Sequence, residues 1–213
     1  MKAKTSRALF IQFAKTPRLG RVKTRMQPQL SESQSLALHC RLVACTYDML
    51  IESALASHEL WITEQADSGF FAGLKPQPKL VMQQGENLGE RMQYAFVEGL
   101  KHHQAVVLVG SDCPRLTKHL LSQALEALQG GASCVLGPAF DGGYVLMGLT
   151  QTDELLFSDV SWGSDQVLIQ TRDRLRQLSW QWEELEAQPD IDRPEDLVHL
   201  EGLNQYEEFI LIY

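Results

Sequence analysis

A short segment near the start of the chain combines a glycine with three basic residues. Gly20, Arg21, Lys23 and Arg25 come just after an apolar run over residues 8–13, which predicts a buried strand. Glycine lets backbone amides approach an anion, and basic side chains donate charge-assisted hydrogen bonds to it. The GxxxxGK[ST] spacing of a Walker loop is absent. We interpret the segment as a phosphate-binding loop, with a solvated basic loop as the alternative.

A single carboxylate, Asp112, follows the most strand-like segment of the sequence, residues 105–109 (AVVLV). Continuous β-branched and apolar residues are typical of a central parallel strand that is covered on both faces. Ligands of open α/β sheets bind at the carboxyl ends of such strands, where the basic segment also lies. Asp112 could hold Mg²⁺ or Mn²⁺ there, together with substrate phosphates. The alternative is a helix cap, but Pro114 and Thr117 better mark the next helix start.

Two segments in the second half of the chain have both a chemical and a structural explanation. The DGGY segment at residues 141–144 suits either a hairpin turn or a close backbone approach to a substrate. The WGSD segment at residues 162–165 precedes a predicted helix, for which Ser164 is an acceptable N-cap. Asp141 and Asp165 are the carboxylates that these segments offer for proton transfer.

Two further segments have the same ambiguity. In GENLGER, residues 85–91, a glycine-relieved turn and Arg91 suit a ribose or a phosphate, but a turn leading into a helix is equally plausible. In DIDRPED, residues 190–196, Asp192 could cap the last helix, with Glu195 completing a capping box. The six histidines are scattered, and no Ser/His/Asp or Cys/His arrangement stands out.

The overall composition excludes some classes of partner. The formal net charge is −8, whereas a protein that binds nucleic acid needs a basic face that releases counterions. An acidic balance also opposes attraction to an anionic membrane surface. The sequence contains no window of roughly 18 consecutive apolar residues that could span a membrane. We therefore expect neither nucleic acid nor membrane as a partner, but a small-molecule substrate.

The cysteines and the start of the chain indicate the compartment. The four cysteines show no CxxC pair and no zinc spacing, so we expect reduced thiols in the core. Residues 1–7 are basic, but Gln12 and Lys15 interrupt the following apolar run before any cleavage site, so we read a strand and not a signal peptide. A cytoplasmic location is expected.

Strands and helices are predicted to alternate along the chain. A capping box at Ser31 and Gln34 begins the first long helix, and a Pro/Gly/basic loop over residues 15–28 precedes it. Strands are predicted at residues 8–13, 59–63, 79–83, 105–109, 133–136, 143–149 and 180–185. Further helices are predicted at residues 88–100, 117–128, 164–178 and 194–203. This alternation predicts one α/β domain over residues 1–213 with a mostly parallel sheet.

Taken in order, the motifs resemble those of a known family. FAKTPRLGRVKTRM, QQGENLGERM, GSDCPRLT, GPAFDGGYVLMGL, SWGSDQVL and DIDRPEDL are similar to segments of the small bacterial GT-A-type transferases. These belong to the nucleotide-diphospho-sugar transferase superfamily and include glycosyltransferases associated with radical-SAM/selenodomain or arsenosugar gene neighbourhoods. The resemblance covers nearly the whole chain, and a more distant similarity links it to nucleotidyltransferases such as 2-phospholactate guanylyltransferase.

The resemblance implies a three-layer α/β/α GT-A-like fold with a mostly parallel mixed sheet and the nucleotide over its N-terminal half. It places four residues in the phosphate-binding loop: Gly20, Arg21, Lys23 and Arg25. It places four others beside the nucleoside: Gly85, Leu88, Gly89 and Arg91. Asp112 takes the position of the metal-binding aspartate. The acceptor side would be lined by Asp141, Gly142, Gly143 and Tyr144, with Trp162 and Asp165 nearby.

These observations together favour a Mg²⁺-dependent glycosyltransferase that uses a nucleotide-diphospho-sugar donor and an unknown acceptor. The metal and the basic loop would stabilise the charge on the leaving diphosphate. Asp141 or Asp165 would accept the proton of an acceptor hydroxyl. One alternative is a nucleotidyltransferase of the 2-phospholactate guanylyltransferase type, which releases pyrophosphate from an NTP. The other is a non-catalytic nucleotide-binding protein.

Overall fold

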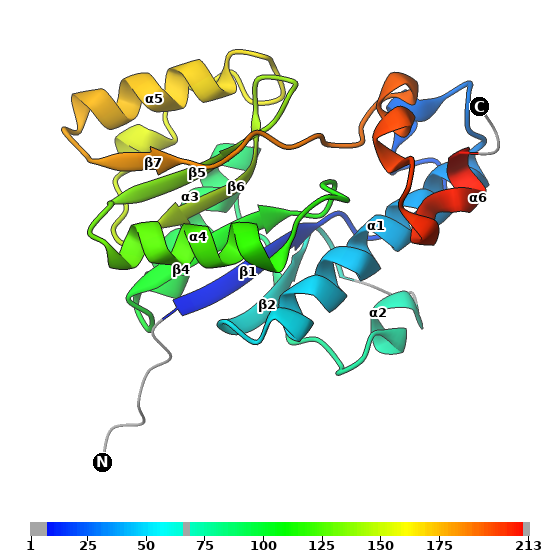
Figure 1. Ribbon diagram of the computed structural model, residues 1–213, viewed down its shortest axis with the longest axis horizontal. Coiled ribbons are helices and arrows are strands. Elements are labelled where there is room, and N and C mark those ends of the chain that lie inside the picture. Colours follow the sequence, from blue (N-terminus) through cyan, green and yellow to red (C-terminus); the bar gives the residue numbers. More distant parts are fainter. Residues whose placement is uncertain (1–7, 66–68, 211–213) are drawn as a thin grey trace.

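A seven-stranded sheet runs through the part of the chain that the structure, a computed structural model, describes: residues 8–65 and 69–210 (Figure 1). The basic residues 1–7 considered above lie outside this part. The strand order is β3-β2-β1-β4-β6-β5-β7. The strands are β1 Ala8–Ala14, β2 Ser57–Ile62, β3 Leu80–Met82, β4 Ala105–Gly110, β5 Cys134–Pro138, β6 Tyr144–Leu149 and β7 Trp182–Glu184.

The sheet is mixed but mostly parallel, as expected. Strand β1 pairs in parallel with β2 and with β4, and β2 pairs in parallel with β3. Strand β6 lies antiparallel to both of its neighbours, β4 and β5, while β7 is parallel to β5. The DGGY turn joins β5 to β6, so this hairpin is what reverses one strand in the sheet.

Helices cover both faces of the sheet and complete three layers. The α-helices are α1 Glu32–Ser53, α2 Gly69–Gly73, α3 Leu88–Leu100, α4 Lys118–Gln129, α5 Val167–Gln177 and α6 Glu207–Ile210, of which α6 belongs to a separate cluster. On one face, Phe10 and Val107 pack with Leu121 of α4. On the other face, Ile11 packs with Phe96 of α3 in a cluster that also includes side chains of α5. This arrangement confirms the predicted α/β/α architecture.

A buried polar side chain ties the two central strands to α1. Gln12 of β1 is fully buried, and its Nε2 donates to the Val43 carbonyl of α1 at 3.0 Å and to Ser111 Oγ at 3.0 Å. Ser111, which directly follows β4, in turn donates to the Phe13 carbonyl at 2.8 Å. These bonds link the carboxyl ends of β1 and β4 to each other and to α1.

Local capping signals locate three of the long helices. Ser31 caps α1 with the predicted capping box to Gln34, and Asn87 and Thr117 cap α3 and α4. The prediction for Ser164 is wrong, because α5 begins at Val167 with Gln166 as its N-cap. Ser164 instead donates to the Ser161 carbonyl at 2.7 Å, which stabilises the preceding turn.

The predicted last helix differs from the observed structure. Residues 194–203 contain a 3₁₀ helix, η3 Pro194–Leu200, and not an α-helix. The prediction that Asp192 caps it is also wrong. The carboxylate of Asp196 accepts from the amides of Asp192 at 2.9 Å and of Arg193 at 2.7 Å. The Asp192 side chain is thereby left for a contact elsewhere.

The C-terminal segment crosses the molecule after β7 and packs beside the first turns of α1 (Figure 1). Ile191, Leu197 and Tyr206 form a separate buried cluster with Met26 and Leu38. The segment also contains η4 Asn204–Tyr206 and α6, and two further 3₁₀ turns are η1 Thr24–Met26 and η2 Glu154–Leu156. None of these short elements, nor α2, was predicted, because they are too short to show a hydrophobic period.

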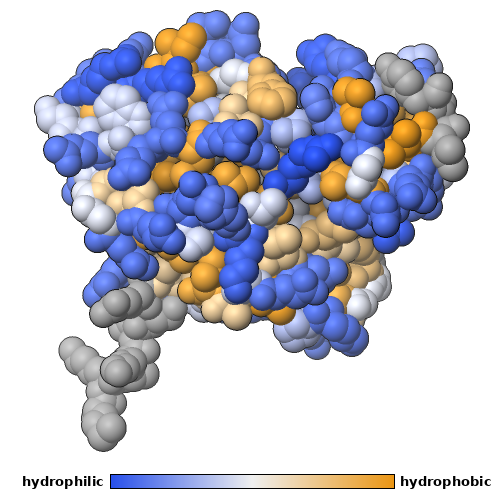
Figure 2. All heavy atoms as spheres, viewed as in Figure 1, coloured by the Kyte–Doolittle hydropathy of each residue, from blue (hydrophilic) through white to orange (hydrophobic). Residues whose placement is uncertain are grey.

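The distribution of hydrophobic residues and the state of the cysteines complete the description of the fold. On the face in Figure 2, hydrophilic residues surround small groups of hydrophobic ones. Cys113 and Cys134 are buried and Cys40 and Cys45 are half-buried, all of them as free thiols. Within residues 8–65 and 69–210, no helix is both long and apolar enough to span a membrane.

Candidate functional site

Two adjoining pockets open where β1 and β4 end. The larger, of about 360 Å³, is lined by the cationic or basic side chains of Lys15, Lys23, His39 and Arg91, and we call it the basic pocket. The smaller, of about 200 Å³, is lined by Asp141 and Asp190 with Tyr144 and Trp162, and we call it the acidic pocket. Leu88, Gly110 and Asp112 line both pockets. Asp112 therefore lies at their shared boundary.

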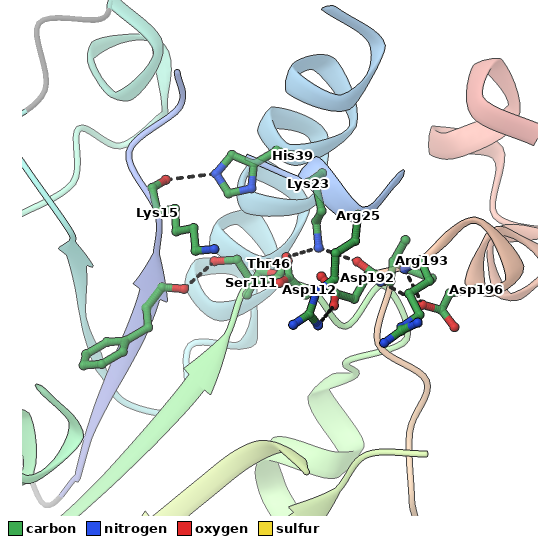
Figure 3. A network of polar contacts seen from close by, with 12 residues as sticks. Lys15, Lys23, Arg25, His39, Thr46, Ser111, Asp112, Asp192, Arg193 and Asp196 are labelled. Atoms are coloured by element: carbon green, nitrogen blue, oxygen red, sulfur yellow. Dashed lines mark hydrogen bonds and ion pairs between the residues drawn. The ribbon is translucent and has the colours of Figure 1, made fainter. Parts of the chain in front are cut away.

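Asp112 is held by the lysine of the basic segment. Lys23 Nζ lies 2.8 Å from Asp112 Oδ1 and also donates to the carbonyl of Ile191 (Figure 3). The side chain of Lys23 is only 3% exposed, whereas that of Asp112 is 46% exposed. Lys23 adopts a left-handed conformation with φ 50°, which directs the chain into η1. The buried ammonium thus fixes a carboxylate that still faces the pockets.

The surroundings of Asp112 favour its charged form. Its enclosed position opposes ionisation, but the charge and hydrogen bond of Lys23, with smaller contributions from His39 and Lys15, lower the pKa of the carboxyl below its ordinary value. Burial lowers the pKa of His39 below its ordinary value, against the opposing charge of Asp112. His39 Nε2 lies 2.9 Å from the Lys15 carbonyl, to which the ring donates.

The DIDRPED segment joins the same site through its backbone and one side chain. The Ile191 amide donates to the Asp112 carbonyl at 2.9 Å. Arg25 contacts Asp192 at 2.6 Å between Nη1 and Oδ2 (Figure 3). Residues separated by about 80 to 170 positions in the chain therefore meet at the tip of β4. Of the three basic residues in the predicted phosphate-binding loop at residues 20–25, Lys23 and Arg25 are each paired with a carboxylate.

The other residues of the two predicted nucleotide-binding segments, 20–25 and 85–91, do not all lie at the pockets. Arg91 lines the basic pocket, and its Nε donates to the Gly85 carbonyl at 3.0 Å. Gly20, with φ +70°, faces the Glu32 side chain, and Arg21 is exposed. Within the described residues, neither Gly20 nor Arg21 lines the two pockets. Lys15, at the end of β1, lines the basic pocket although the sequence pattern did not single it out.

The DGGY segment forms a turn in which its aspartate has a structural role. The Gly143 amide donates to Asp141 Oδ1 at 2.8 Å, and the Gly142 amide donates to the Ala139 carbonyl at 3.3 Å. Gly142 has φ +88°, and a Cβ there would lie 2.4 Å from the Asp165 carbonyl oxygen. Glycine is therefore required at this position for close packing. Asp141 nevertheless lines the acidic pocket.

The WGSD segment packs on the start of α3. A Cβ at Gly89 would lie 2.4 Å from Trp162 Nε1, so Gly89 makes room for the indole. Trp162 lines the acidic pocket, as do Leu88, Gly143 and Tyr144. Asp165 does not line either pocket, and its Oδ1 accepts from Gln166 Nε2 at 3.0 Å.

Asp190 is a pocket residue that the sequence pattern did not single out. It lines the acidic pocket, and burial together with the negative charges of Asp141 and Asp196 raises its pKa to about 6. A carboxyl with a perturbed pKa in a pocket is a candidate for proton transfer. The DIDRPED motif indicated only Asp192, as a helix cap. His39 was missed because nothing in its local sequence distinguishes it from a core histidine.

The fit to a divalent cation depends on a single carboxylate. Among residues 8–65 and 69–210, no group of three or more His, Cys, Asp or Glu side chains is arranged to hold a metal ion. Asp112, by contrast, is ionised and open to both pockets. Mg²⁺ often binds one or two carboxylates and takes its other ligands from substrate phosphates and water. The residues fit a cation shared with a phosphate ligand.

The sequence comparison identifies the family. A family model described as "Uncharacterized protein conserved in bacteria (DUF2064)" matches residues 46–164, more than half of the 213 residues. The chain belongs to this family. The matched region of this DUF2064 member contains Asp112, Asp141 and Trp162, and therefore most of the acidic pocket. No curated protein matches the sequence at a significant level.

Solved structures confirm the predicted fold. A protein from Desulfovibrio desulfuricans G20, provisionally described as a nucleotide-diphospho-sugar transferase, is 29% identical, with 97% of this chain and 94% of that chain covered and a TM-score of 0.86. A cytidylyltransferase from Leptospira borgpetersenii is 12% identical, with coverage of 94% and 87% and a TM-score of 0.60. Glucosyl-3-phosphoglycerate synthase from Mycobacterium tuberculosis, solved with Mg²⁺ and UDP, is 8% identical, with coverage of 97% and 79% and a TM-score of 0.57. This chain thus has the fold of nucleotide-diphospho-sugar transferases and cytidylyltransferases.

Proposed function

We propose that this protein is a divalent-cation-dependent transferase that uses a nucleotide-activated substrate, and specifically a glycosyltransferase with a nucleotide-diphospho-sugar donor. The observation that carries the proposal is the position of Asp112. This ionised carboxylate lies at the boundary of a basic pocket suited to phosphates and an acidic pocket suited to an acceptor. The similarity to the D. desulfuricans protein supports the same class of donor.

The basic pocket would bind the nucleoside diphosphate part of the donor. Lys15 and Arg91 line it, and their donors would contact phosphate oxygens. Leu88, which is 44% exposed, offers an apolar surface for the nucleoside. Gly20, Arg21 and Arg25 belong to the predicted phosphate loop, and Arg25 would need to exchange Asp192 for a phosphate. Gly85 supports Arg91, and Gly89 supports the neighbouring Trp162.

Asp112 would hold Mg²⁺ or Mn²⁺ together with the donor phosphates. The cation would act as a Lewis acid on the leaving diphosphate. The buried Lys23 keeps Asp112 ionised and oriented, because its ammonium is committed to that carboxylate and to the Ile191 carbonyl. Lys23 is thus a positioning residue in this proposal and not a direct phosphate ligand.

The acidic pocket would bind the acceptor. Gly142 and Gly143 shape the turn that carries Asp141, and Tyr144 and Trp162 provide the apolar lining. A group that takes the acceptor proton should have a pKa near the working pH. Asp190, whose pKa is about 6, meets this condition best, and Asp141 lies in the same pocket. Asp165 lies outside both pockets, so its participation would require a movement of the WGSD segment.

The test is a product analysis with purified protein, Mg²⁺ and a panel of nucleotide sugars and NTPs. We expect release of a nucleoside diphosphate from one nucleotide sugar, its abolition by EDTA, and its restoration by Mg²⁺ or Mn²⁺. The Asp112→Asn variant serves as the negative control. Pyrophosphate released from an NTP, without turnover of any nucleotide sugar, would replace the glycosyltransferase by a nucleotidyltransferase. Binding of nucleotides without turnover of either class would indicate a nucleotide-binding protein.

One observation favours the nucleotidyltransferase as the second candidate. The positive charges of Lys15 and Arg91, with a cation at Asp112, would suit a triphosphate as well as a diphosphate. The pyrophosphate measurement above distinguishes the two reactions directly.

A further inference from the structure

The acidic pocket contains two carboxylates that have no cationic partner. Its lining residues include no lysine, arginine or histidine. Asp112, on its boundary, is paired with Lys23, but no ion pair involves Asp141 or Asp190 within residues 8–65 and 69–210. Asp141 accepts one backbone hydrogen bond, from the Gly143 amide. The pocket therefore holds negative charge that the described protein does not neutralise.

Aromatic rings line the same cavity. Tyr144 and Trp162 face it together with the apolar Val145 and Val167. The indole of Trp162 is held over Gly89, where no Cβ interferes. The face of an aromatic ring attracts cations, most strongly for tryptophan. Carboxylates and aromatic rings around one small cavity form a site that suits an ammonium group on an apolar body.

Electrostatic repulsion between the carboxylates of Asp141 and Asp190 also favours a positively charged ligand. The negative charge of Asp141 is, after burial, the second cause that raises the pKa of Asp190. A positive group between the two carboxylates would offset this repulsion, whereas an anionic group would add to it. Asp112 does not relieve the repulsion, because it is itself negative and its partner Lys23 lines the basic pocket and not the acidic one.

We propose that the acidic pocket selects an acceptor that carries a protonated amine, held by Asp141 and Asp190 and packed on Trp162. The inference rests on the proposed function in taking this pocket as the acceptor site, and it narrows the unknown acceptor to one chemical class. Neutral acceptors bind more weakly, and acceptors that carry a carboxylate or phosphate are repelled. One charge-assisted hydrogen bond between acceptor and protein corresponds to roughly tenfold in affinity.

Three probes that share a hydroxymethylphenyl body test the proposal: 4-(hydroxymethyl)benzylamine, 4-methylbenzyl alcohol and 4-(hydroxymethyl)benzoate, which differ in charge. Their binding to the full chain is measured by calorimetry and by saturation-transfer NMR. We expect the amine to bind about tenfold more tightly than the neutral alcohol, and the benzoate most weakly. The double variant Asp141→Asn/Asp190→Asn should reduce the three affinities to nearly the same value. Trp162→Ala should weaken all three, which locates them in this pocket.

Glu183→Gln is the matched control, because Glu183 is exposed on the edge strand β7 and outside both pockets. It should leave the order of the three probes unchanged. Equal binding of the amine and the neutral alcohol, or a preference for the amine that survives the double variant, would overturn the proposal. Nucleotide binding is measured separately on the same protein. Failure to bind any nucleotide would count against the proposed function, whereas loss of charge selectivity alone would count against the acceptor class.

Discussion

The two pockets that meet at Asp112 differ in whether the aspartates beside them form ion pairs. Around the basic pocket, Lys23 is paired with Asp112, and Arg25 with Asp192. In the acidic pocket, Asp141 and Asp190 have no cationic partner within the described residues. Paired charges hold the architecture in place, whereas uncompensated charges are available to a ligand. Among the described residues, the aspartates around the basic pocket therefore lie in ion pairs, whereas Asp141 and Asp190 of the acidic pocket do not.

Asp112→Asn would break the comparison most severely, because both pockets depend on this residue. We expect nucleotide affinity in Mg²⁺ to fall about 100-fold or more, since the amide cannot replace the charge that the cation needs. Calorimetry with and without Mg²⁺ measures the loss. Asp192→Asn, which removes the partly exposed pair with Arg25 and one negative charge from the lining of the basic pocket, should weaken binding by less than about threefold. Unchanged Mg²⁺-dependent affinity in Asp112→Asn would disprove the metal assignment.

Lys23→Ala and Arg25→Ala compare the loss of a buried charge, at Lys23, with the loss of an exposed charge, at Arg25. Lys23→Ala leaves the Ile191 carbonyl without its donor and Asp112 without its counter-ion, so we expect a loss of about 2–3 kcal/mol, measured by urea unfolding. Arg25→Ala removes a pair that is largely exposed and should cost less than about 1 kcal/mol. Arg25→Ala should weaken nucleoside diphosphates more than nucleosides. Equal stabilities of the two variants would mean that the burial of Lys23 has no energetic consequence.

Gly89→Ala tests how firmly the aromatic wall of the acidic pocket is held. The new methyl group would overlap the Trp162 indole, so we expect a loss of about 1–3 kcal/mol and an altered near-ultraviolet circular dichroism spectrum. Gly73→Ala provides the control, because a Cβ there meets nothing within 4 Å. It should change stability by less than about 0.5 kcal/mol. If the two variants unfold together, the indole does not depend on Gly89.

Asp190→Asn sharpens the comparison through its pH dependence. The folded carboxyl has a pKa of about 6, above its ordinary value of 3.8, so it keeps its proton to higher pH than in the unfolded chain. Stability is therefore lost as pH rises from about 4 through about 6, and the loss persists above that range. We expect Asp190→Asn to remove this loss and to be more stable than the parent by about 1 kcal/mol at pH 7. Melting temperatures between about pH 4 and pH 8 would show the crossover, and parallel curves would contradict it.

Asp141→Asn should have the smallest effect on stability. Asparagine retains the oxygen that accepts from the Gly143 amide, so the turn persists and the melting temperature should stay within about 2 °C. Donor affinity should also persist. If Asp141 assists proton transfer, the transfer rate falls at least about tenfold. Nearly normal transfer in this variant, combined with a large loss in Asp190→Asn, would assign the proton transfer to Asp190.

Much of the fold was predictable because its signals are local. The apolar runs of β1 and β4 and the capping box of α1 each lie within a few consecutive residues, and all three predictions are confirmed. Ser164 has the residue type of a cap, but the turn it stabilises ends before α5 begins. A cap prediction from residue type alone cannot distinguish these two outcomes.

The site was less predictable because its contacts are distant in sequence. The motifs indicated Lys23 as a basic residue, but not its burial between Asp112 and Ile191, which lies 168 positions away. Asp190 could be recognised as a pocket residue only from the structure, in which the chain around residue 188 lies beside the DGGY turn. Its pKa depends on neighbours from a different part of the chain, so no pattern within DIDRPED could reveal it.

The long crossing of the C-terminal segment also has a consequence for the order of synthesis. Lys23 and Asp112 are both synthesised before Ile191, whose carbonyl accepts from Lys23 and whose amide donates to the Asp112 carbonyl. Until Ile191 leaves the ribosome, the ammonium of Lys23 lacks one of its partners, and Met26 and Leu38 lack their apolar cover. The growing chain can therefore pair strands β1 to β6 before its site is complete, so ligand binding is expected to begin only once the C-terminal segment has docked.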